Sequence, residues 1–311
     1  MKLVFCGTPE FAVPTLEAVI AAGHEVALVL AQPDRPVGRK AELHEPPVKQ
    51  SAVRHGIPVA QPEKLKNNLE LRSQLEAIKP DAILVVAYGR IIPKWMLELP
   101  RYGNINLHGS LLPRWRGAAP IQWAVAAGDT VTGVTTMLLE EGLDTGPMLL
   151  RRELPIGPDT TSVELFSALA PIGAELMVET LRRLEEGSIA SERQDDSKST
   201  LAPILTRDDA RIDFTRTAQE IYNRYRGFQP WPGAWTTLRG KKLIVHRMQL
   251  SGAGSAAQPG TLVVSEDHLS VAASDGNILV LDEVQMEGKK RMPADEFLHG
   301  HQVNTGEALG Q

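Results

Sequence analysis

The chain has 311 residues, which suffices for one large domain or two ordinary ones, and a formal net charge of −5. This charge excludes a globally basic nucleic-acid-binding protein, so any contact with nucleic acid has to come from a local patch. The single cysteine, Cys6, excludes an internal disulfide and is typical of a reducing compartment. No apolar run approaches the roughly 18 residues of a membrane helix, and Gly7 interrupts the first run too early for a signal peptide. We therefore expect a soluble, cytoplasmic protein.

The first half of the chain alternates strand and helix patterns. Apolar runs predict strands over residues 3–6, 25–31, 57–60, 82–87, 105–108, 134–139 and 148–154. Helical periodicity predicts helices over residues 11–22, 68–78, 121–127 and 162–186. Such alternation is typical of βαβ units with helices on both faces of a mostly parallel sheet. We predict a Rossmann-like α/β domain over residues 1–187.

The character of the sequence changes after Gly187. Residues 188–206 are polar and have the composition of a linker. Residues 207–311 contain one helical pattern, 217–226, and short β-rich runs broken by Gly and Pro, at 234–238, 242–250, 260–264, 269–273 and 278–286. Short strands at that spacing predict a small antiparallel, OB-like barrel as a second domain.

The run from Asn104 to His108 alternates apolar and polar residues. In a strand, Ile105 and Leu107 point to one face while Asn106 and His108 point to the other. Buried polar side chains are costly unless paired, which favours a functional site. An edge strand with a solvated polar face fits the run equally well.

A second polar loop, residues 140–147, follows the predicted strand 134–139 and carries Asp144. Ligands of parallel sheets gather at the carboxyl ends of the strands, where we expect Asp144 to join Asn106 and His108. Taken alone, Asp144 is better read as a turn residue that binds its own backbone. Together, the three suit acyl transfer: His titrates near neutrality, Asp orients or charges it, and an amide stabilises an oxyanion.

Three rival chemistries find little support. Ser110 would complete a hydrolase triad, but it does not stand on a Gly-x-Ser-x-Gly elbow. A metal site needs further closely spaced ligands, and His299 and His301 lie far away near the C-terminus. The turn at residues 7–9 lacks the dinucleotide fingerprint, and there is no P-loop. We expect neither a metal nor a nucleotide cofactor.

Asn106-x-His108 followed by Ser-Leu-Leu-Pro, with Asp144 in a Leu-Asp-Thr-Gly loop, resembles the folate-dependent formyltransferases. The runs 32–39, 114–122 and 227–235 are similar to those of the family's tRNA-modifying members. The resemblance covers nearly the whole chain in order. It implies formyl transfer from 10-formyltetrahydrofolate to the α-amine of methionine on initiator tRNA.

The resemblance also implies roles for individual residues. Asn106 donates to the oxyanion of a tetrahedral intermediate, His108 shares in that stabilisation or moves protons, and Asp144 positions His108 and assists proton transfer to the departing folate nitrogen. Which of His108 and Asp144 moves each proton stays open. The residues expected to bind folate are Tyr88, Gly89, Ile91, Ser110, Leu111, Leu112, Pro113, Gly142 and Leu143.

For tRNA, the family uses the loop that matches residues 34–49, with an arginine equivalent to Arg39. Here this loop has four basic and three acidic residues and departs from the more basic, glycine-containing family pattern. Residues 207–248 have nine Lys or Arg and four Asp or Glu, a net of +5 that suits an RNA backbone. A solvated basic face beside core tryptophans, Trp231 and Trp235, is the alternative. The residues expected to contact tRNA are Arg39, Lys40, Arg114, Arg116, Arg226, Lys241 and Lys242.

Two other functions remain open at this point. A formyltransferase acting on a nucleotide-linked amino sugar can share the Asn-x-His-Gly-Ser-Leu-Leu-Pro run, although it has no use for a basic barrel. A non-catalytic RNA-binding protein on a retired enzyme scaffold is argued against by the intact Asn, His and Asp set. We expect the protein to act as a monomer.

Overall fold

The computed structural model describes residues 1–37, 42–265 and 268–311. The chain forms two compact units: unit 1 comprises residues 1–120, 131–155 and 164–203, and unit 2 comprises residues 121–130, 156–163 and 204–311. The boundary after residue 203 falls inside the predicted linker. Unlike the predicted second domain, unit 2 includes the segments 121–130 and 156–163, which precede the predicted linker.

Unit 1 is built on a sheet of seven strands in the order β10-β9-β7-β6-β1-β2-β5. The strands are β1 (Lys2–Gly7), β2 (Glu25–Leu30), β5 (Val59–Ala60), β6 (Ala82–Val86), β7 (Asn104–His108), β9 (Val131–Leu138) and β10 (Met148–Pro155). The strands from β7 to β5 run parallel, whereas β9 and β10 are antiparallel to their neighbours. The predicted Rossmann-like, mostly parallel sheet is confirmed.

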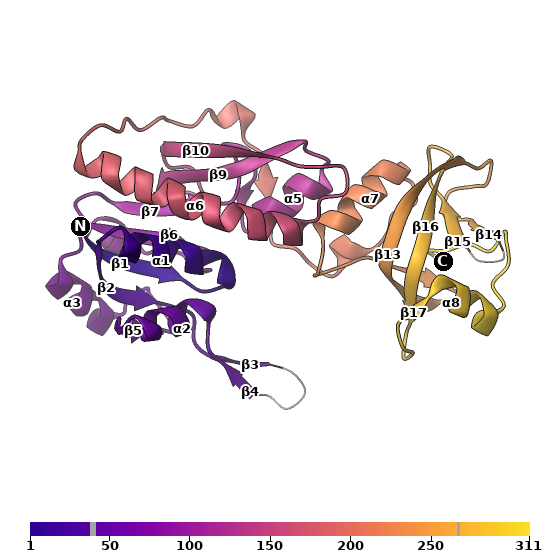
Figure 1. Ribbon diagram of the computed structural model, residues 1–311, viewed down its shortest axis with the longest axis horizontal. Helices are drawn as coiled ribbons and strands as arrows, with labels where there is room; N and C mark the ends of the chain where they lie inside the picture. Colours follow the sequence, from indigo (N-terminus) through magenta and orange to yellow (C-terminus); the bar gives the residue numbers. More distant parts are fainter. Residues whose placement is uncertain (38–41, 266–267) are drawn as a thin grey trace. The chain divides into compact units, whose positions relative to one another are not determined.

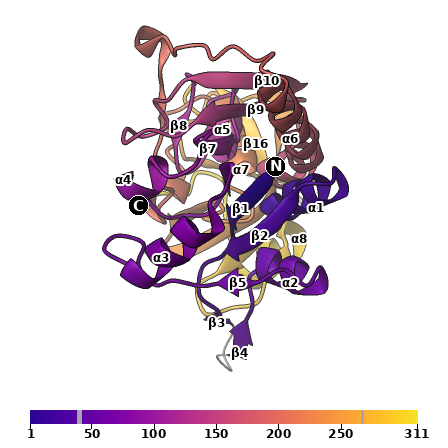
Figure 2. The same ribbon diagram turned by 90° about the vertical axis from the view of Figure 1, so that its left-hand side faces the viewer.

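Helices cover both faces of this sheet (Figures 1 and 2). One face carries α1 (Val13–Ala21), α2 (Pro47–Arg54) and α6 (Ser162–Glu185), and the other carries α3 (Leu69–Ile78) and α4 (Lys94–Leu97). Helix α3 begins where the sequence predicts, because the Asn68 side chain accepts a hydrogen bond from the Leu71 amide at 3.0 Å. The short helices α2 and α4 lack a long periodic pattern and were not predicted. No helix in the described part of the chain is long and apolar enough to cross a membrane.

Strand β7 lies inside the sheet between β6 and β9, and all five of its residues are buried. Its register pairs Asn106 with Val85 of β6, so Asn106 faces the side covered by α3 and α4. Leu107 faces the opposite side, where it packs directly on Gly173 of α6. The alternation of faces is therefore confirmed, and the edge-strand alternative is wrong.

Much of the predicted linker packs on unit 1. Its strand β11 (Leu201–Ala202) pairs in parallel with β8 (Arg116–Gly117), and a short 3-10 helix, η2 (Asp196–Lys198), precedes it. Gly117 approaches β11 so closely that a Cβ there would lie 2.5 Å from the Ala202 carbonyl oxygen. The sequence did not predict this pairing, because the segment is polar and strands as short as β8 and β11 show no periodic pattern.

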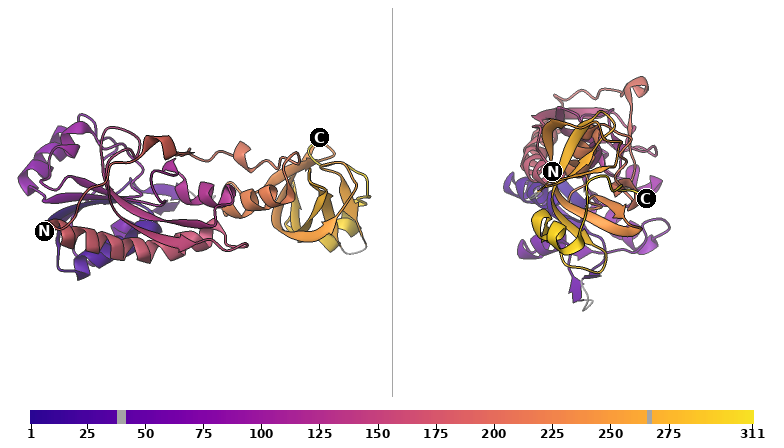
Figure 3. Two further views of the ribbon diagram at one scale, coloured as in Figure 1. Left: turned by 90° about the horizontal axis from the view of Figure 1, so that it is seen from above. Right: turned by 90° about the vertical axis from the view of Figure 1, so that its right-hand side faces the viewer.

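Unit 2 centres on an antiparallel sheet that curls into a half-barrel, as its orange and yellow strands show in Figure 3. The strands are β12 (Trp235–Leu238), β13 (Lys241–Gly254), β14 (Leu262–Val264), β15 (Leu269–Ala272), β16 (Asn277–Met286) and β17 (Met292–Pro293). The helices α7 (Ala218–Gly227) and α8 (Ala294–His301) close its apolar core, which includes Leu243, Leu281 and Phe297. The barrel-like second domain is confirmed.

Arg226 of α7 is buried and holds unit 2 together. Its guanidinium donates to the carbonyl oxygens of Gly157 at 3.1 Å and Thr160 at 2.8 Å, and to Asn223 Oδ1 at 2.8 Å. These oxygens satisfy a charge that would otherwise be costly to bury. The segment 156–163 is thereby fixed to α7. The expected contact of Arg226 with tRNA stays a prediction, and its guanidinium is engaged within unit 2.

Gly227 permits a close approach between α7 and α5 (Pro120–Ala126). A Cβ at Gly227 would lie 2.6 Å from the Ala126 nitrogen and 2.8 Å from the Gln122 oxygen. We expect Gly227→Ala to lower the free energy of unfolding of unit 2 by about 1–3 kcal/mol, because backbone atoms would have to move apart. Urea unfolding followed by circular dichroism measures this change.

Gly300 in α8 provides the matched control, because a Cβ there meets no atom within 4 Å. Gly300→Ala should leave stability unchanged or raise it by up to about 1 kcal/mol, since Ala is the better helix former. Equal effects of the two substitutions would contradict the close packing of α5 on α7.

Candidate active site

The candidate site lies on the α3 and α4 face of the sheet, around the end of β7. Strand β9 pairs Leu138 with Ile105, so β9 ends beside the start of β7 and not beside His108. The loop 139–147 folds back over the sheet and brings Asp144 Oδ2 to 3.7 Å from His108 Nδ1. The sequence correctly paired these residues, but the expected reason, adjacent parallel strand ends, is wrong because β9 is antiparallel.

His108 is buried and fixed by the main chain. Its Nε2 lies 2.8 Å from the Trp115 carbonyl oxygen. Because a carbonyl only accepts hydrogen bonds, Nε2 carries the hydrogen, and Nδ1 of the neutral ring is left to accept a proton. At 3.7 Å from Nδ1, the Asp144 carboxylate is too far for a good hydrogen bond but close enough to stabilise an imidazolium.

Asp144 is held by its side chain and by its main chain. Its Oδ2 accepts a hydrogen bond from the Gly117 amide at 2.8 Å, and its own carbonyl accepts one from Gln194 Nε2 at 2.7 Å. The residue adopts a φ of 51°, in the left-handed region that non-glycine residues rarely occupy. Gln194 was missed, because a lone glutamine in a polar stretch gives no sequence signal.

Asn106 precedes His108 by two residues and lies on the same face of β7, with 9% of its surface exposed. Within the described residues its side-chain amide makes no hydrogen bond, so the amide is available to a ligand. Asn104, one step further back, donates instead to the carbonyl oxygens of Met96 at 2.9 Å and Leu97 at 3.2 Å. Asn104 therefore anchors α4, while Asn106 can serve an oxyanion.

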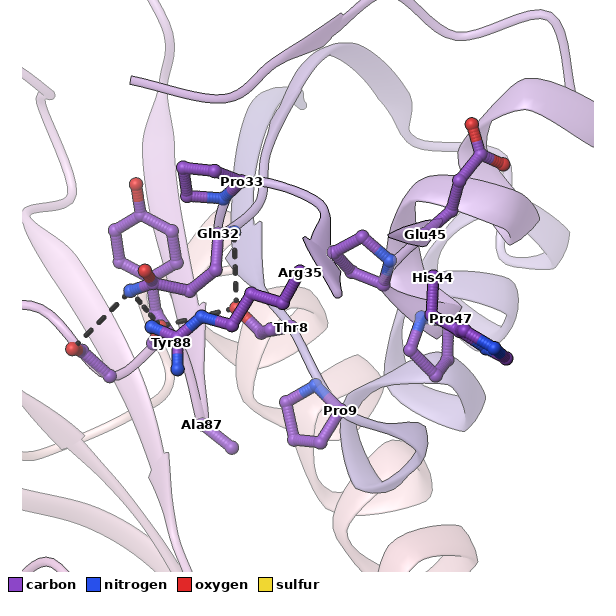
Figure 4. Close-up of a pocket in the computed structure, with 12 residues that line it drawn as sticks. Thr8, Pro9, Gln32, Pro33, Arg35, His44, Glu45, Pro47, Ala87 and Tyr88 are labelled. Atoms are coloured by element: carbon purple, nitrogen blue, oxygen red, sulfur yellow. Dashed lines mark hydrogen bonds between the residues drawn. The ribbon is translucent and has the colours of Figure 1, made fainter. Parts of the chain in front are cut away.

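A cavity of about 490 Å³ opens at the carboxyl ends of β1, β2 and β6 (Figure 4). Thr8 Oγ1 and Gln32 Nε2 both donate to the Tyr88 carbonyl oxygen, at 3.2 and 3.1 Å, and tie the three loops together. The cavity wall includes the positively charged Arg35, the imidazole of His44 and several prolines. Because β6 is the neighbour of β7, this cavity opens at the edge of the sheet where β7 ends at His108.

The residues expected to bind folate after β6 differ in exposure. The Tyr88 ring is buried in the apolar core, which raises the pKa of its hydroxyl, and Tyr88 is among the residues that line the cavity. A folate contact of Tyr88 stays a prediction, and burial of the ring favours a contact through the main chain. Gly89 lines the cavity with a φ of 76°, and Ile91 is 92% exposed.

The loop after β7 serves mainly to shape the site. Ser110 is fully buried and its Oγ donates to the Arg114 carbonyl at 2.6 Å, while Leu112 packs against Met137 and Met148. The Ser110 and Leu112 side chains are therefore engaged within the protein, and the expected folate contacts of these two residues stay predictions. Leu111 and Pro113 are partly exposed, and Gly142 and Leu143 are exposed in the loop that carries Asp144.

The basic residues of the first predicted domain that are expected to contact tRNA fall into three groups. Arg39 and Lys40 lie outside the described residues. Arg116 is buried, and its guanidinium donates to Gln194 Oε1 at 2.9 Å and Asp196 Oδ1 at 2.7 Å, so its side chain is engaged within unit 1 and its contact with tRNA stays a prediction. Arg114 is exposed, with its guanidinium over the Trp115 ring at 4.5 Å.

In unit 2, the two lysines that begin β13 reach the surface. Lys241 is exposed, and Lys242 Nζ lies 4.4 Å from the centre of the Trp235 ring. Trp231 is 52% exposed, so the alternative that both tryptophans belong to the core is wrong for this residue. Among the described residues of either unit, no group of three His, Cys, Asp or Glu side chains could hold a metal ion.

Two family models match most of the chain, and known relatives match all of it. Residues 1–181 match the formyl transferase family, and residues 204–302 match its C-terminal domain. The methionyl-tRNA formyltransferase of Acidobacterium capsulatum is 64% identical over 100% of both chains. That of Koribacter versatilis is 57% identical over 100% of this chain and 99% of its own.

A solved structure shares the fold. WlaRD, a sugar 3N-formyl transferase crystallised in the presence of dTDP and 5-N-formyl-THF, has a TM-score of 0.68 at 17% identity and covers 93% of this chain and 99% of its own. The relatives carry more weight than this fold match, because they are 64% and 57% identical to this chain, whereas the solved structure is 17% identical. The chain therefore belongs to the formyl transferase family, and within it groups with the methionyl-tRNA formyltransferases.

Proposed function

We propose that this protein transfers the formyl group of 10-formyltetrahydrofolate to the α-amine of methionyl initiator tRNA. The observation that carries the proposal is the grouping of Asn106, His108 and Asp144 on one buried face. The identity with the methionyl-tRNA formyltransferase of Acidobacterium capsulatum over both units supports the choice of acceptor. We infer that the protein acts in the cytoplasm and as a monomer.

The chemistry follows from the positions of the three side chains. The amine attacks the formyl carbon, and the Asn106 amide donates to the oxyanion that develops. The proton lost by the amine passes to His108 Nδ1, since Nε2 is committed to the Trp115 carbonyl. Asp144 stabilises the imidazolium, which then returns the proton to the departing folate nitrogen. The products are the formylated amine and tetrahydrofolate.

Folate would lie between the loop after β6 and the loop that carries Asp144. Ile91 and Leu143 are 92% and 63% exposed, and exposed apolar side chains beside a site are suited to an aromatic ligand. The main chain of Gly89 and Gly142 offers polar groups beside them. The fold relative WlaRD was crystallised with a formyl folate, which supports the same cosubstrate class here.

We infer that tRNA contacts Arg114 near the site and Lys241 and Lys242 in unit 2. All three side chains carry positive charge at or near the surface. Trp231 adds an exposed ring on which a base can stack. Arg39 and Lys40 remain expected contacts of the acceptor stem. Arg116 and Arg226 are omitted because both are buried.

The direct test supplies the protein with 10-formyltetrahydrofolate and charged initiator tRNA. We expect formyl-methionine, detected after mild hydrolysis of the ester bond to tRNA. A parallel reaction offers a nucleotide-linked amino sugar, the class of acceptor named for the fold relative. Formylation of the sugar and not of the tRNA would replace the proposed function with the rival one.

We expect Asn106→Ala to lower kcat about 100-fold, because removing one oxyanion donor typically costs about 3 kcal/mol of transition-state stabilisation. The KM for tRNA should change little. Steady-state kinetics at saturating folate measures both constants.

Asn104→Ala is the matched control on the same strand and face. It should lower the free energy of unfolding by about 1–3 kcal/mol, because two carbonyls would be left without their partner, while kcat stays within a few-fold. A larger loss of kcat in Asn104→Ala than in Asn106→Ala would contradict the oxyanion role.

The double variant Lys241→Ala/Lys242→Ala should raise the KM for tRNA several-fold and leave kcat nearly unchanged. The logarithmic dependence of KM on salt should become less steep, by about 0.7–0.9 for each phosphate that the protein no longer neutralises. Lys289→Ala/Lys290→Ala removes the same charge from an exposed turn of the same unit. Equal effects of the two double variants would indicate a general charge effect and rule out a local contact.

A further inference from the structure

We propose that Gln194 is a positioning residue for formyl transfer, acting through Asp144. The proposal rests on the proposed function of the site. It assigns part of the predicted linker, residues 194–202, to the catalytic centre. Every contact that carries it lies within unit 1.

Gln194 is buried, with 5% of its surface exposed, and its amide bridges three groups. Its Nε2 donates to the carbonyl oxygens of Asp144 and Gly146, both at 2.7 Å. Its Oε1 accepts from Arg116 Nε at 2.9 Å. A buried amide with both ends in use fixes the main chain of the loop that carries Asp144.

The loop needs such a tether because its conformation is strained. Asp144 has a φ of 51°, a backbone conformation that L-residues rarely adopt. Gly146 is pressed against β9, where a Cβ would lie 1.9 Å from the Leu138 carbonyl oxygen. The two hydrogen bonds from Gln194 therefore fix the main chain at Asp144, where the backbone is strained, and at Gly146, where the loop contacts β9.

The same segment also supports the groups that fix His108 and the Asp144 carboxylate. Thr200 Oγ1 accepts from the Trp115 amide at 2.9 Å, and the Thr200 carbonyl accepts from the Arg116 amide at 2.8 Å. Trp115 supplies the carbonyl that binds His108 Nε2. The next residue after Arg116, Gly117, supplies the amide that binds Asp144. The segment 194–202 thus holds the main chain of Trp115 and Arg116, which positions the groups that bind the His108 and Asp144 side chains.

The chemistry of the partners requires a glutamine at this position. Two carbonyl oxygens require a donor, and the Arg116 guanidinium requires an acceptor. Glutamate keeps the acceptor but turns an oxygen toward two carbonyls. Methionine fills a similar volume and offers neither group.

The test compares Gln194→Met in two backgrounds. We expect Gln194→Met to lower kcat about tenfold in the otherwise wild-type enzyme but less than twofold in Asp144→Asn, because residues acting through one another are non-additive. The KM values for folate and tRNA should change little. An equal loss of kcat in both backgrounds, or no loss in the wild type, would overturn the proposal.

Gln194→Glu provides a second variant that retains the acceptor for Arg116 and so keeps the test alive if Gln194→Met does not fold. It should show the same background-dependent loss of kcat. Gln285→Met is the matched control in unit 2, since Gln285 also bridges two partners, accepting from His246 and donating to the Lys289 carbonyl at 2.8 Å each. A similar loss of kcat in Gln285→Met would overturn the proposal.

A second readout does not depend on activity. The Gly117 amide hydrogen, bound to Asp144, should exchange faster with solvent in Gln194→Met than in the wild type, while Gln285→Met leaves the rate unchanged. Unchanged exchange in Gln194→Met would overturn the positioning role. A wild-type protein that formylates no charged tRNA would overturn the proposed function instead, and the exchange measurement would still decide the placement of Asp144.

Discussion

Because β9 runs antiparallel to β7, the chain leaves β9 at the edge of the sheet opposite to His108. Strand β10 begins beside the end of β9, where Met148 pairs with Met137, and the loop 139–147 between the two strands reaches His108 and places Asp144 beside it. The remaining features of the site follow from holding that loop in place. The Gly117 amide binds the Asp144 side chain, and Gln194 binds the main chain of the loop. The grouping of Asn106, His108 and Asp144 therefore depends on the path of this loop and on the contacts that fix it.

The imidazole of His108 illustrates how a main-chain contact selects a chemical role. The sequence leaves open which group moves each proton. The Trp115 carbonyl accepts from Nε2, and so Nδ1 is the atom that can receive a proton on the side facing Asp144. Which nitrogen of His108 can accept a proton thus depends on Trp115, which contributes only its main-chain carbonyl to this contact.

Charge in the sequence is a poor guide to which arginine side chains reach the surface. Arg116 and Arg226 stand in basic runs, yet each is buried and used to join segments distant in sequence. A buried guanidinium is tolerated only where oxygens surround it, and those oxygens come from residues 157–160 and 194–196. Lys241 and Lys242 also form part of a basic run. Their side chains reach the surface at the start of β13.

The sequence by itself determined the strands and helices with strong apolar periodicity and a barrel-like second domain, and it predicted Asn106, His108 and Asp144 as site residues. Alternation over Asn104–His108 placed polar and apolar side chains on the correct faces because the period of a strand is fixed by its geometry. Only the tertiary structure decided the direction of β9, the burial of Tyr88 and Arg116, and the use of Gln194. These features depend on contacts between segments far apart along the chain, and no local pattern of residues encodes such contacts.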